Sequence, residues 1–168
     1  MPGDEVTGSW VAIPRLTGRA WVFMHHLAAE TILPARAATL APHEARALLF
    51  HELDTGIART IVAGDVLVAG ENLGHGPGAA AAVAALRAAG VTVALARSFA
   101  ADFADAAMTL GMPALVLDAP ESIRTGQTVR VDIDGGRVVN LSSGDRFPIR
   151  NLTEELLGRL RECLGARD

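Results

Sequence analysis

The sequence predicts an α/β protein with a parallel sheet at its core, helices on the faces of this sheet and a β-hairpin near the C-terminus. Three short apolar runs alternate with two runs of helix formers, at residues 66–69, 79–89, 91–96, 100–110 and 113–117. Such alternation favours parallel strands joined by right-handed crossovers. Residues 128–134 and 137–141 alternate apolar and polar side chains around Gly135 and Gly136, a pattern typical of a hairpin.

The composition limits the classes of function. With 168 residues, half of them hydrophobic, the chain is long enough for a single domain (1–168) that buries a core. Its net charge of -4 argues against nucleic acid or an anionic membrane as a partner. We find no apolar run of roughly 20 residues and no basic, then apolar, N-terminal segment, so we expect a cytoplasmic protein without a membrane span. A single cysteine, Cys163, excludes an internal disulfide and an iron–sulfur cluster held by one chain alone.

The remaining elements are expected on either side of this alternating region. Pro42 opens a helix in its first turn, Gly56 ends that helix, and Thr153 begins the last helix. Residues 1–17 are expected to be an arm or an edge strand, strand-like only at 9–13, and a strand is expected at 20–23. A polar loop at 24–30 and an apolar loop or turn segment at 31–33, which stops at Pro34, should follow. The two helices are expected at 41–53 and, as an amphipathic helix, at 153–164.

The whole chain is organised around residues 64–90, which predict a strand, a glycine-rich loop and a helix in direct succession. The helix is expected to end at Gly90, which suits a left-handed C-cap. The loop contains four glycines, Gly70, Gly74, Gly76 and Gly78. Because glycine has no side chain, backbone N–H groups of this loop could approach an anion at the positive end of the helix.

One interpretation of this loop is a dinucleotide-binding fingerprint. That fingerprint requires an acidic residue roughly 20 positions further on, where this chain has Arg97 and Ser98. Pro77 also lacks an N–H group that a phosphate cradle would use. A tight strand-to-helix turn without any ligand is a second interpretation.

From residue 18 to residue 149 the chain resembles the small subunit of 3-isopropylmalate dehydratase, the swivel domain of the aconitase superfamily. The resemblance rests on the order and spacing of six segments: 18–23 (GRAWVF), 32–36 (ILPAR), 64–74 (GDVLVAGENLG), 88–100 (AAGVTVALARSFA), 111–113 (GMP) and 139–144 (VNLSSG). It implies a swivelling β/β/α domain that caps a separate large subunit. It further implies that this chain holds no cofactor, that the large subunit's cysteines hold a four-iron, four-sulfur cluster, and that a 2-hydroxy acid is dehydrated and rehydrated between the two chains.

The chain departs from the family pattern where that pattern places its catalytic residues. The family's Gly-Ser-Ser-Arg-Glu, with a serine base and an arginine for a substrate carboxylate, is replaced by Gly-Pro-Gly-Ala-Ala at 76–80. At 98–106 two more arginines are missing, and Asp102 and Asp105 are present instead. A change of about five charge units argues against a polycarboxylate substrate.

Histidines occur on the two loops that the family brings to its active site. Histidine can serve as acid, base or metal ligand near neutral pH, and nearby acids could orient it. Our candidate catalytic residues are His75 as the replacement base, with His25, His26, Glu30, Asp102 and Asp105. Our candidate substrate-binding residues are Asn72, Gly74, Gly76, Gly78, Arg97 and Ser98, and no metal ligand is assigned.

Three hypotheses follow. The first is a diverged small subunit of an aconitase-type hydro-lyase, which acts with a large subunit on a small molecule less anionic than a dicarboxylate. The second is a catalytically silent swivel domain that binds or regulates a partner, and the third is a stand-alone enzyme or metal-binding protein built on the histidines. The first predicts that His25 or His26 approaches His75, with Glu30, Asp102 or Asp105 close enough to share a proton or a water molecule.

Overall fold

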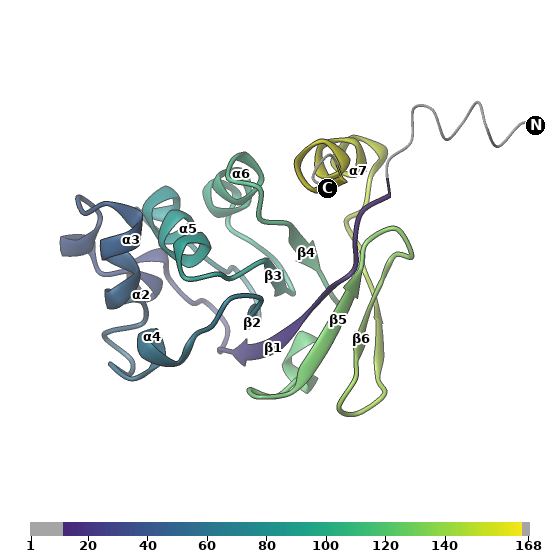
Figure 1. Cartoon of the computed structure of the whole chain (residues 1–168), viewed down its shortest axis with the longest axis horizontal. Helices are drawn as coiled ribbons and strands as arrows, with labels where there is room; N and C mark the ends of the chain where they lie inside the picture. The colour runs from purple at the N-terminus through teal and green to yellow at the C-terminus, as the bar shows by residue number, and fades with distance from the viewer. Residues whose placement is uncertain (1–11, 166–168) are drawn as a thin grey trace, which may run out of the picture.

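Seven strands form one sheet in a computed structural model that describes residues 12–165 (Figure 1). The strand order is β4-β3-β2-β1-β5-β6-β7. Strands β1 to β4 are parallel, and β5, β6 and β7 extend the sheet antiparallel from the other side of β1. The strands are β1 (Leu16–Val22), β2 (Val66–Ala69), β3 (Val93–Ala96), β4 (Ala114–Val116), β5 (Thr128–Asp132), β6 (Arg137–Asn140) and β7 (Arg146–Pro148).

Helices connect the parallel strands, and shorter helical turns fill the long connection between β1 and β2. The helices are α2 (Ala29–Ile32), α3 (Pro42–Ala45), α4 (Ile57–Thr60), α5 (Ala79–Ala88), α6 (Ala101–Thr109) and α7 (Glu154–Leu160), with 3-10 turns at Ala35–Ala37, Arg46–Leu48 and Pro120–Ser122 and a π-helical turn at Arg161–Gly165. None of the helices formed by residues 12–165 combines the length and the apolar character that a membrane crossing requires.

The core lies on both faces of the parallel half of the sheet. In β2, Val66 and Val68 enter one apolar cluster, which also holds the inner face of β5 and β6 and Leu160 of α7. Leu67 and Ala69 enter the other cluster, under α2, α3 and α5. Strands buried on both faces need apolar residues at every position, which explains the continuous apolar runs that revealed β2, β3 and β4 in the sequence.

The predicted α/β class, the β-α-β-α-β order and the C-terminal hairpin are all confirmed. Gly90 adopts a φ of +101° after α5, as the C-cap interpretation requires. Thr153 caps α7, because its Oγ1 accepts a hydrogen bond of 3.1 Å from the N–H of Leu156.

Several boundaries predicted before β2 are wrong. Strand β1 begins at Leu16, inside the segment expected to be an arm or an edge strand, and it lies between β2 and β5 rather than at an edge. Residues 1–11 of that segment lie outside the described residues. The apolar segment at 31–33 was not predicted to be helical, yet its first two residues belong to α2, which buries Ala29 and Ile32 one turn apart.

The helix expected at 41–53 is interrupted. Only α3 and a 3-10 turn form, and Phe50 then takes a φ of +57°. This turn directs Phe50 into the core, where its ring stacks on Phe23 with centroids 4.4 Å apart and its N–H donates to the carbonyl of Ile32. Burial of a large aromatic side chain therefore outweighs continuation of the helix.

Candidate functional site

Two loops lie together at the carboxyl ends of β1 and β2. Loop 23–28 follows β1 and loop 70–78 follows β2, and parallel strands place such loops at the same edge of the sheet. Backbone hydrogen bonds join them, from His26 N to Glu71 O (2.7 Å), from Gly74 N to Leu27 O (2.7 Å) and from Ala29 N to His75 O (2.9 Å). The loops that carry the three candidate histidines are therefore held to each other by the main chain.

The first half of the glycine loop is occupied by the protein itself. The N–H groups of residues 71 to 74 all donate within the chain: Glu71 to the His25 ring, Asn72 to Ser98 Oγ, Leu73 to the Ser98 carbonyl and Gly74 to Leu27. A Cβ atom on Gly70 would lie 2.1 Å from His25 Nδ1, and one on Gly74 would lie 2.3 Å from the Phe103 ring. These two glycines accommodate side chains of the protein.

The second half of the loop is open. Gly76 and Gly78 are exposed, adopt φ values of +84° and +94°, and have no neighbouring atom within reach of an added Cβ. Gly78 is the N-cap of α5, and within the described chain no side chain caps this helix. A hollow of about 210 Å³ adjoins it, lined by Glu30, Leu33, Ala35, Ala38, Pro77, Gly78 and Ala81. The positive helix end favours an anion there, while the Glu30 carboxylate opposes a second negative charge.

His75 is held in one orientation by a backbone carbonyl. Its Nε2 lies 2.9 Å from the carbonyl oxygen of His26, and the rings of the two residues have centroids 6.4 Å apart. A carbonyl oxygen can only accept, so Nε2 carries the hydrogen and the neutral ring keeps its lone pair on Nδ1. Nδ1 can gain a proton without loss of the hydrogen bond at Nε2. The hydrogen bond at Nε2 therefore leaves Nδ1 as the ring nitrogen with the lone pair.

His25 is held in the complementary way. Its Nδ1 accepts a hydrogen bond of 2.8 Å from the N–H of Glu71, while its ring fills the space above Gly70. The neutral ring therefore carries its hydrogen on Nε2, and a proton on Nδ1 would break the contact with Glu71. The two rings therefore differ in tautomer: the hydrogen bonds leave an N–H group at Nε2 of His25 and a lone pair at Nδ1 of His75.

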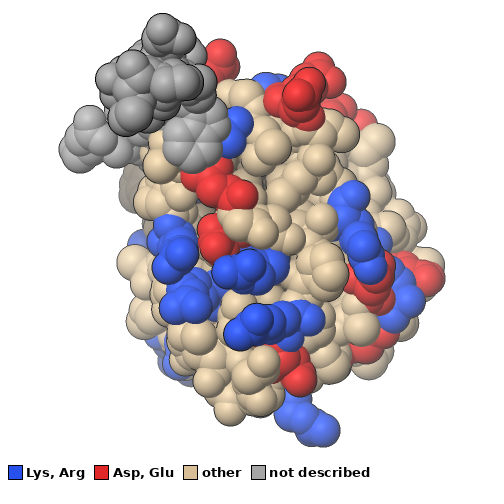
Figure 2. Space-filling model, turned by 90° about the vertical axis from the view of Figure 1, so that its right-hand side faces the viewer, with Lys and Arg blue, Asp and Glu red and all other residues tan. Residues whose placement is uncertain are grey.

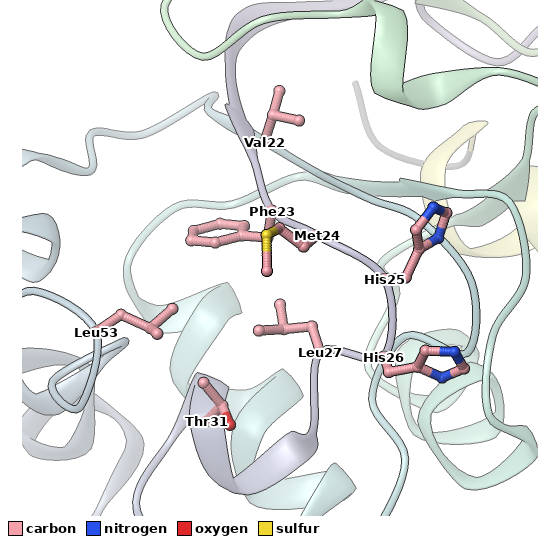
Figure 3. A pocket seen from close by; sticks show the side chains of 8 residues that line it. All are labelled: Val22, Phe23, Met24, His25, His26, Leu27, Thr31 and Leu53. Carbon is pink, nitrogen blue, oxygen red and sulfur yellow. The ribbon is translucent and has the colours of Figure 1, made fainter.

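A larger hollow of about 340 Å³ lies beside the histidines and is mostly apolar (Figure 3). Phe23, Met24, Leu27 and Leu53 surround it, with Thr31 at its base and the rings of His25 and His26 directed away from its centre. Met24 is 83% exposed. The hollow can take an aliphatic group and offers it no cation.

Arg97 and Ser98 follow β3 at the same edge of the sheet. Ser98 Oγ holds the N–H of Asn72, which has a φ of +58°. Arg97 forms an ion pair with Glu121. The pKa of the Glu121 carboxyl is lowered: partial desolvation raises it, but a hydrogen bond from its own backbone N–H and the contact with Arg97 together lower it by more. The guanidinium of Arg97 is thus engaged by a carboxylate of the same chain, in a pair that stays partly exposed to solvent.

The candidate acids are exposed and not joined to the histidines. Asp102 lies in the first turn of α6, which begins beside the loop because Ala100 N donates to Leu73 O (2.9 Å). Within residues 12–165, the side chains of Glu30, Asp102 and Asp105 form no ion pair and no hydrogen bond, and no three His, Cys, Asp or Glu side chains converge in a way that could hold a metal. The structure thus brings the three histidines together without their expected carboxylate partners.

Two parts of this site escaped the sequence analysis. Glu121 lies 24 residues from Arg97, and no local pattern links the two. Leu53 was assigned to a helix that does not form, so its place beside Met24 could not be foreseen.

Comparison with known proteins places this architecture in a recognised class. A crystal structure of 3-isopropylmalate dehydratase from Methanocaldococcus jannaschii superposes with a TM-score of 0.83 and 25% identity, covering 89% of this chain and 90% of that one. The fold is therefore that of the small, swivel-type subunit found among aconitase-type hydro-lyases.

Sequence relatives identify the family within this class. No family model matches the chain. The 3-isopropylmalate dehydratase small subunit of Nautilia profundicola is 33% identical over 146 residues, which cover 84% of this chain and 88% of the relative. Small subunit 2 of Archaeoglobus fulgidus is 33% identical over 150 residues, with coverages of 88% and 90%. The chain belongs to the family of 3-isopropylmalate dehydratase small subunits.

Proposed function

We propose that this protein is a diverged small subunit of an aconitase-type hydro-lyase, which acts with a separate large subunit on an acid that has fewer carboxylates than isopropylmalate. The observation that carries the proposal is the hydrogen bond from His75 Nε2 to the His26 carbonyl, which leaves Nδ1 as a free base at the edge of the sheet. The position just beyond it, where the family has serine and arginine, holds Pro77, Gly78 and Ala79.

In this proposal His75 performs the proton transfer. Nδ1 takes a proton from the carbon next to the substrate carboxylate, and the electron pair of that C–H bond forms the double bond. The C–O bond on the neighbouring carbon breaks, its electron pair leaves with hydroxide, and hydroxide takes a proton from solvent to become water. Hydration reverses these steps, with the proton returned from Nδ1. Nε2–H of His25 is available to hold a substrate oxygen. The uncapped start of α5 would bind a single carboxylate.

The charges around the site support a less anionic substrate. The chain offers no guanidinium at Ala79, and the guanidinium of Arg97 is paired with Glu121. Glu30 lines the hollow at the start of α5, and Asp102 is exposed at the start of α6. A second carboxylate on the substrate would therefore lie near acidic side chains and would find no arginine for a bidentate contact. The apolar hollow beside Met24 suits an aliphatic group of the substrate instead.

An iron–sulfur cluster would have to come from the large subunit. The single Cys163 lies in the π-helical turn after α7, far along the chain from the histidine loops, and one thiolate cannot hold a cluster. A cluster on the partner would act as the Lewis acid that draws off the substrate hydroxyl.

A catalytically silent subunit is the second candidate. Its support is that Glu30, Asp102 and Asp105 are all exposed and, among residues 12–165, make no contact that would orient a catalytic histidine. The metal-binding hypothesis has no comparable support from the described residues.

The test uses this chain co-expressed with the aconitase-type large subunit of the same genome, purified without oxygen. Two acids that differ by one carboxylate, 2-isopropylmaleate and 4-methylpent-2-enoate, are offered for hydration. We expect the monocarboxylate to be hydrated about ten times faster than the dicarboxylate or more. The reason is that the second carboxylate lacks an ion-pair partner worth about 1.4 kcal/mol, which corresponds to a tenfold change in rate. Faster hydration of the dicarboxylate would refute the proposal, and a stable complex that hydrates neither acid would favour the silent subunit.

A further inference from the structure

The antiparallel half of the sheet has one face that none of the helices within residues 12–165 covers (Figure 1). In β5 and β6, Val129, Val131 and Val138 point into the core, so the alternate residues point outward. The register places Arg130 opposite Val139, and Val139 opposite Arg146 on β7. Arg137 lies on the same outward side of β6, two residues from Val139.

These three arginines, Arg130, Arg137 and Arg146, form what we call the arginine face. Strand spacing puts the Cβ atoms of Arg130 and Arg146 about 10 Å apart, with Arg137 roughly 7–8 Å from each. Figure 2 looks onto the side of the molecule where β5, β6 and β7 lie and shows blue side chains gathered on it. The chain as a whole carries a net charge of -4, so this cationic group is a local reversal of sign.

The arginine face differs from the other arginines near it. Arg19 is paired with the buried Asp65 at 3.1 Å, and Arg15 with Asp132 at 3.6 Å. In the part of the chain that the structure describes, no ion pair or hydrogen bond involves the side chains of Arg130, Arg137 or Arg146. Asp132 is the register partner of Arg137 on the same side of the sheet, but its carboxylate already faces Arg15 at 3.6 Å. Cations therefore outnumber anions on this face, and an anionic surface would complement them.

A second copy of this chain does not fit the arginine face through a two-fold contact, because such a contact would set the three cations against themselves. A nucleic acid fits poorly, since the remaining surface of a chain with net charge -4 would repel its phosphates. An acidic surface on a protein partner has the complementary charge and the flat shape that an open sheet face requires.

We propose that the arginine face docks an acidic surface of the partner large subunit, an inference that rests on the proposed function. Strand β1 connects the two regions: Thr17 pairs with Arg130, and Val22 ends the strand at the histidine loops. Five residues of strand span about 17 Å. A protein interface of ordinary size buries about 800 Å² on each partner and is roughly 30 Å across, so a subunit that covers the histidines also reaches the arginines.

The test measures binding of the purified large subunit to three versions of this chain at low and at moderate salt. The first is the native chain, the second carries Arg130→Gln, Arg137→Gln and Arg146→Gln, and the third is a control of equal charge change. The control replaces arginines on α4, α5 and α7 that have no ion pair within residues 12–165, as Arg59→Gln, Arg87→Gln and Arg159→Gln.

We expect the arginine-face variant to bind about ten- to a hundredfold more weakly than the native chain, with a smaller salt dependence, and the control to bind within about threefold. Circular dichroism checks that each variant folds. Equal binding by the arginine-face variant and the native chain would overturn this inference and leave the proposed function intact. Failure of the native chain to bind the large subunit would overturn both. If the native chain bound a DNA duplex tightly and the arginine-face variant did not, the inference of a protein partner would be overturned in favour of a nucleic acid.

Discussion

Replacing His75 with alanine is expected to lower kcat of the assembled hydro-lyase by about a hundred- to ten-thousandfold, the usual contribution of a positioned general base. The substitution removes Nδ1, the base that the His26 carbonyl leaves free. Binding of the large subunit should persist, because the main-chain bonds between the two loops do not depend on the imidazole. Steady-state hydration of the preferred acid measures the effect.

His26 provides the matched control. It contributes its backbone carbonyl to His75 but no side-chain hydrogen bond in the described chain, and its φ of +58° is one that asparagine tolerates. His26→Asn should therefore lower the activity much less than His75→Ala does, and added imidazole should partly restore the activity of His75→Ala. A His75→Ala complex with unchanged kcat would show that the proton is taken by another group.

Gly74→Ala is expected to lower the free energy of unfolding by about 2–5 kcal/mol, while Gly76→Ala lowers it by only about 1 kcal/mol. Both glycines have a φ of +84°, so the backbone strain of an alanine is the same at the two positions. They differ in space: a Cβ on Gly74 would lie 2.3 Å from the Phe103 ring, and one on Gly76 would meet no atom within 4 Å.

Urea unfolding of the two variants measures this difference directly. The pair also separates two roles of the glycine loop, because Gly74 accommodates the core and Gly76 faces solvent beside the site. Equal losses of stability in the two variants would show that Phe103 can move aside at little cost, and that the loop is less tightly packed against α6 than its geometry indicates.

The fold was predictable where burial is complete. Strands β2 and β3 are apolar at all four positions because both of their faces are covered, and the alanine-rich α5 follows from helix propensity. Prediction failed between β1 and β2, where short helices depend on tertiary contacts. Phe50 leaves a helical pattern in order to stack on Phe23, a residue 27 positions earlier, and no local signal encodes that contact.

The site was predictable as a set of loops but not as a set of atoms. The sequence and its family resemblance placed His25, His26 and His75 at one edge of the sheet, and the structure joins their loops. The sequence could not assign roles to ring nitrogens, since these depend on the His26 carbonyl and the Glu71 N–H. It also could not show that Arg97 pairs with Glu121.

The central claim is that His75 presents a free base. The most direct test of this claim is to determine which ring nitrogen of the neutral His75 imidazole carries the hydrogen. Nitrogen-15 NMR of the isolated chain at alkaline pH distinguishes a protonated from an unprotonated ring nitrogen at each histidine, and exposed His43 supplies an internal reference. The structure predicts that His75 carries its hydrogen on Nε2 alone, with Nδ1 unprotonated. A hydrogen on Nδ1, or a mixture of the two tautomers, would contradict the assignment of His75 as the base.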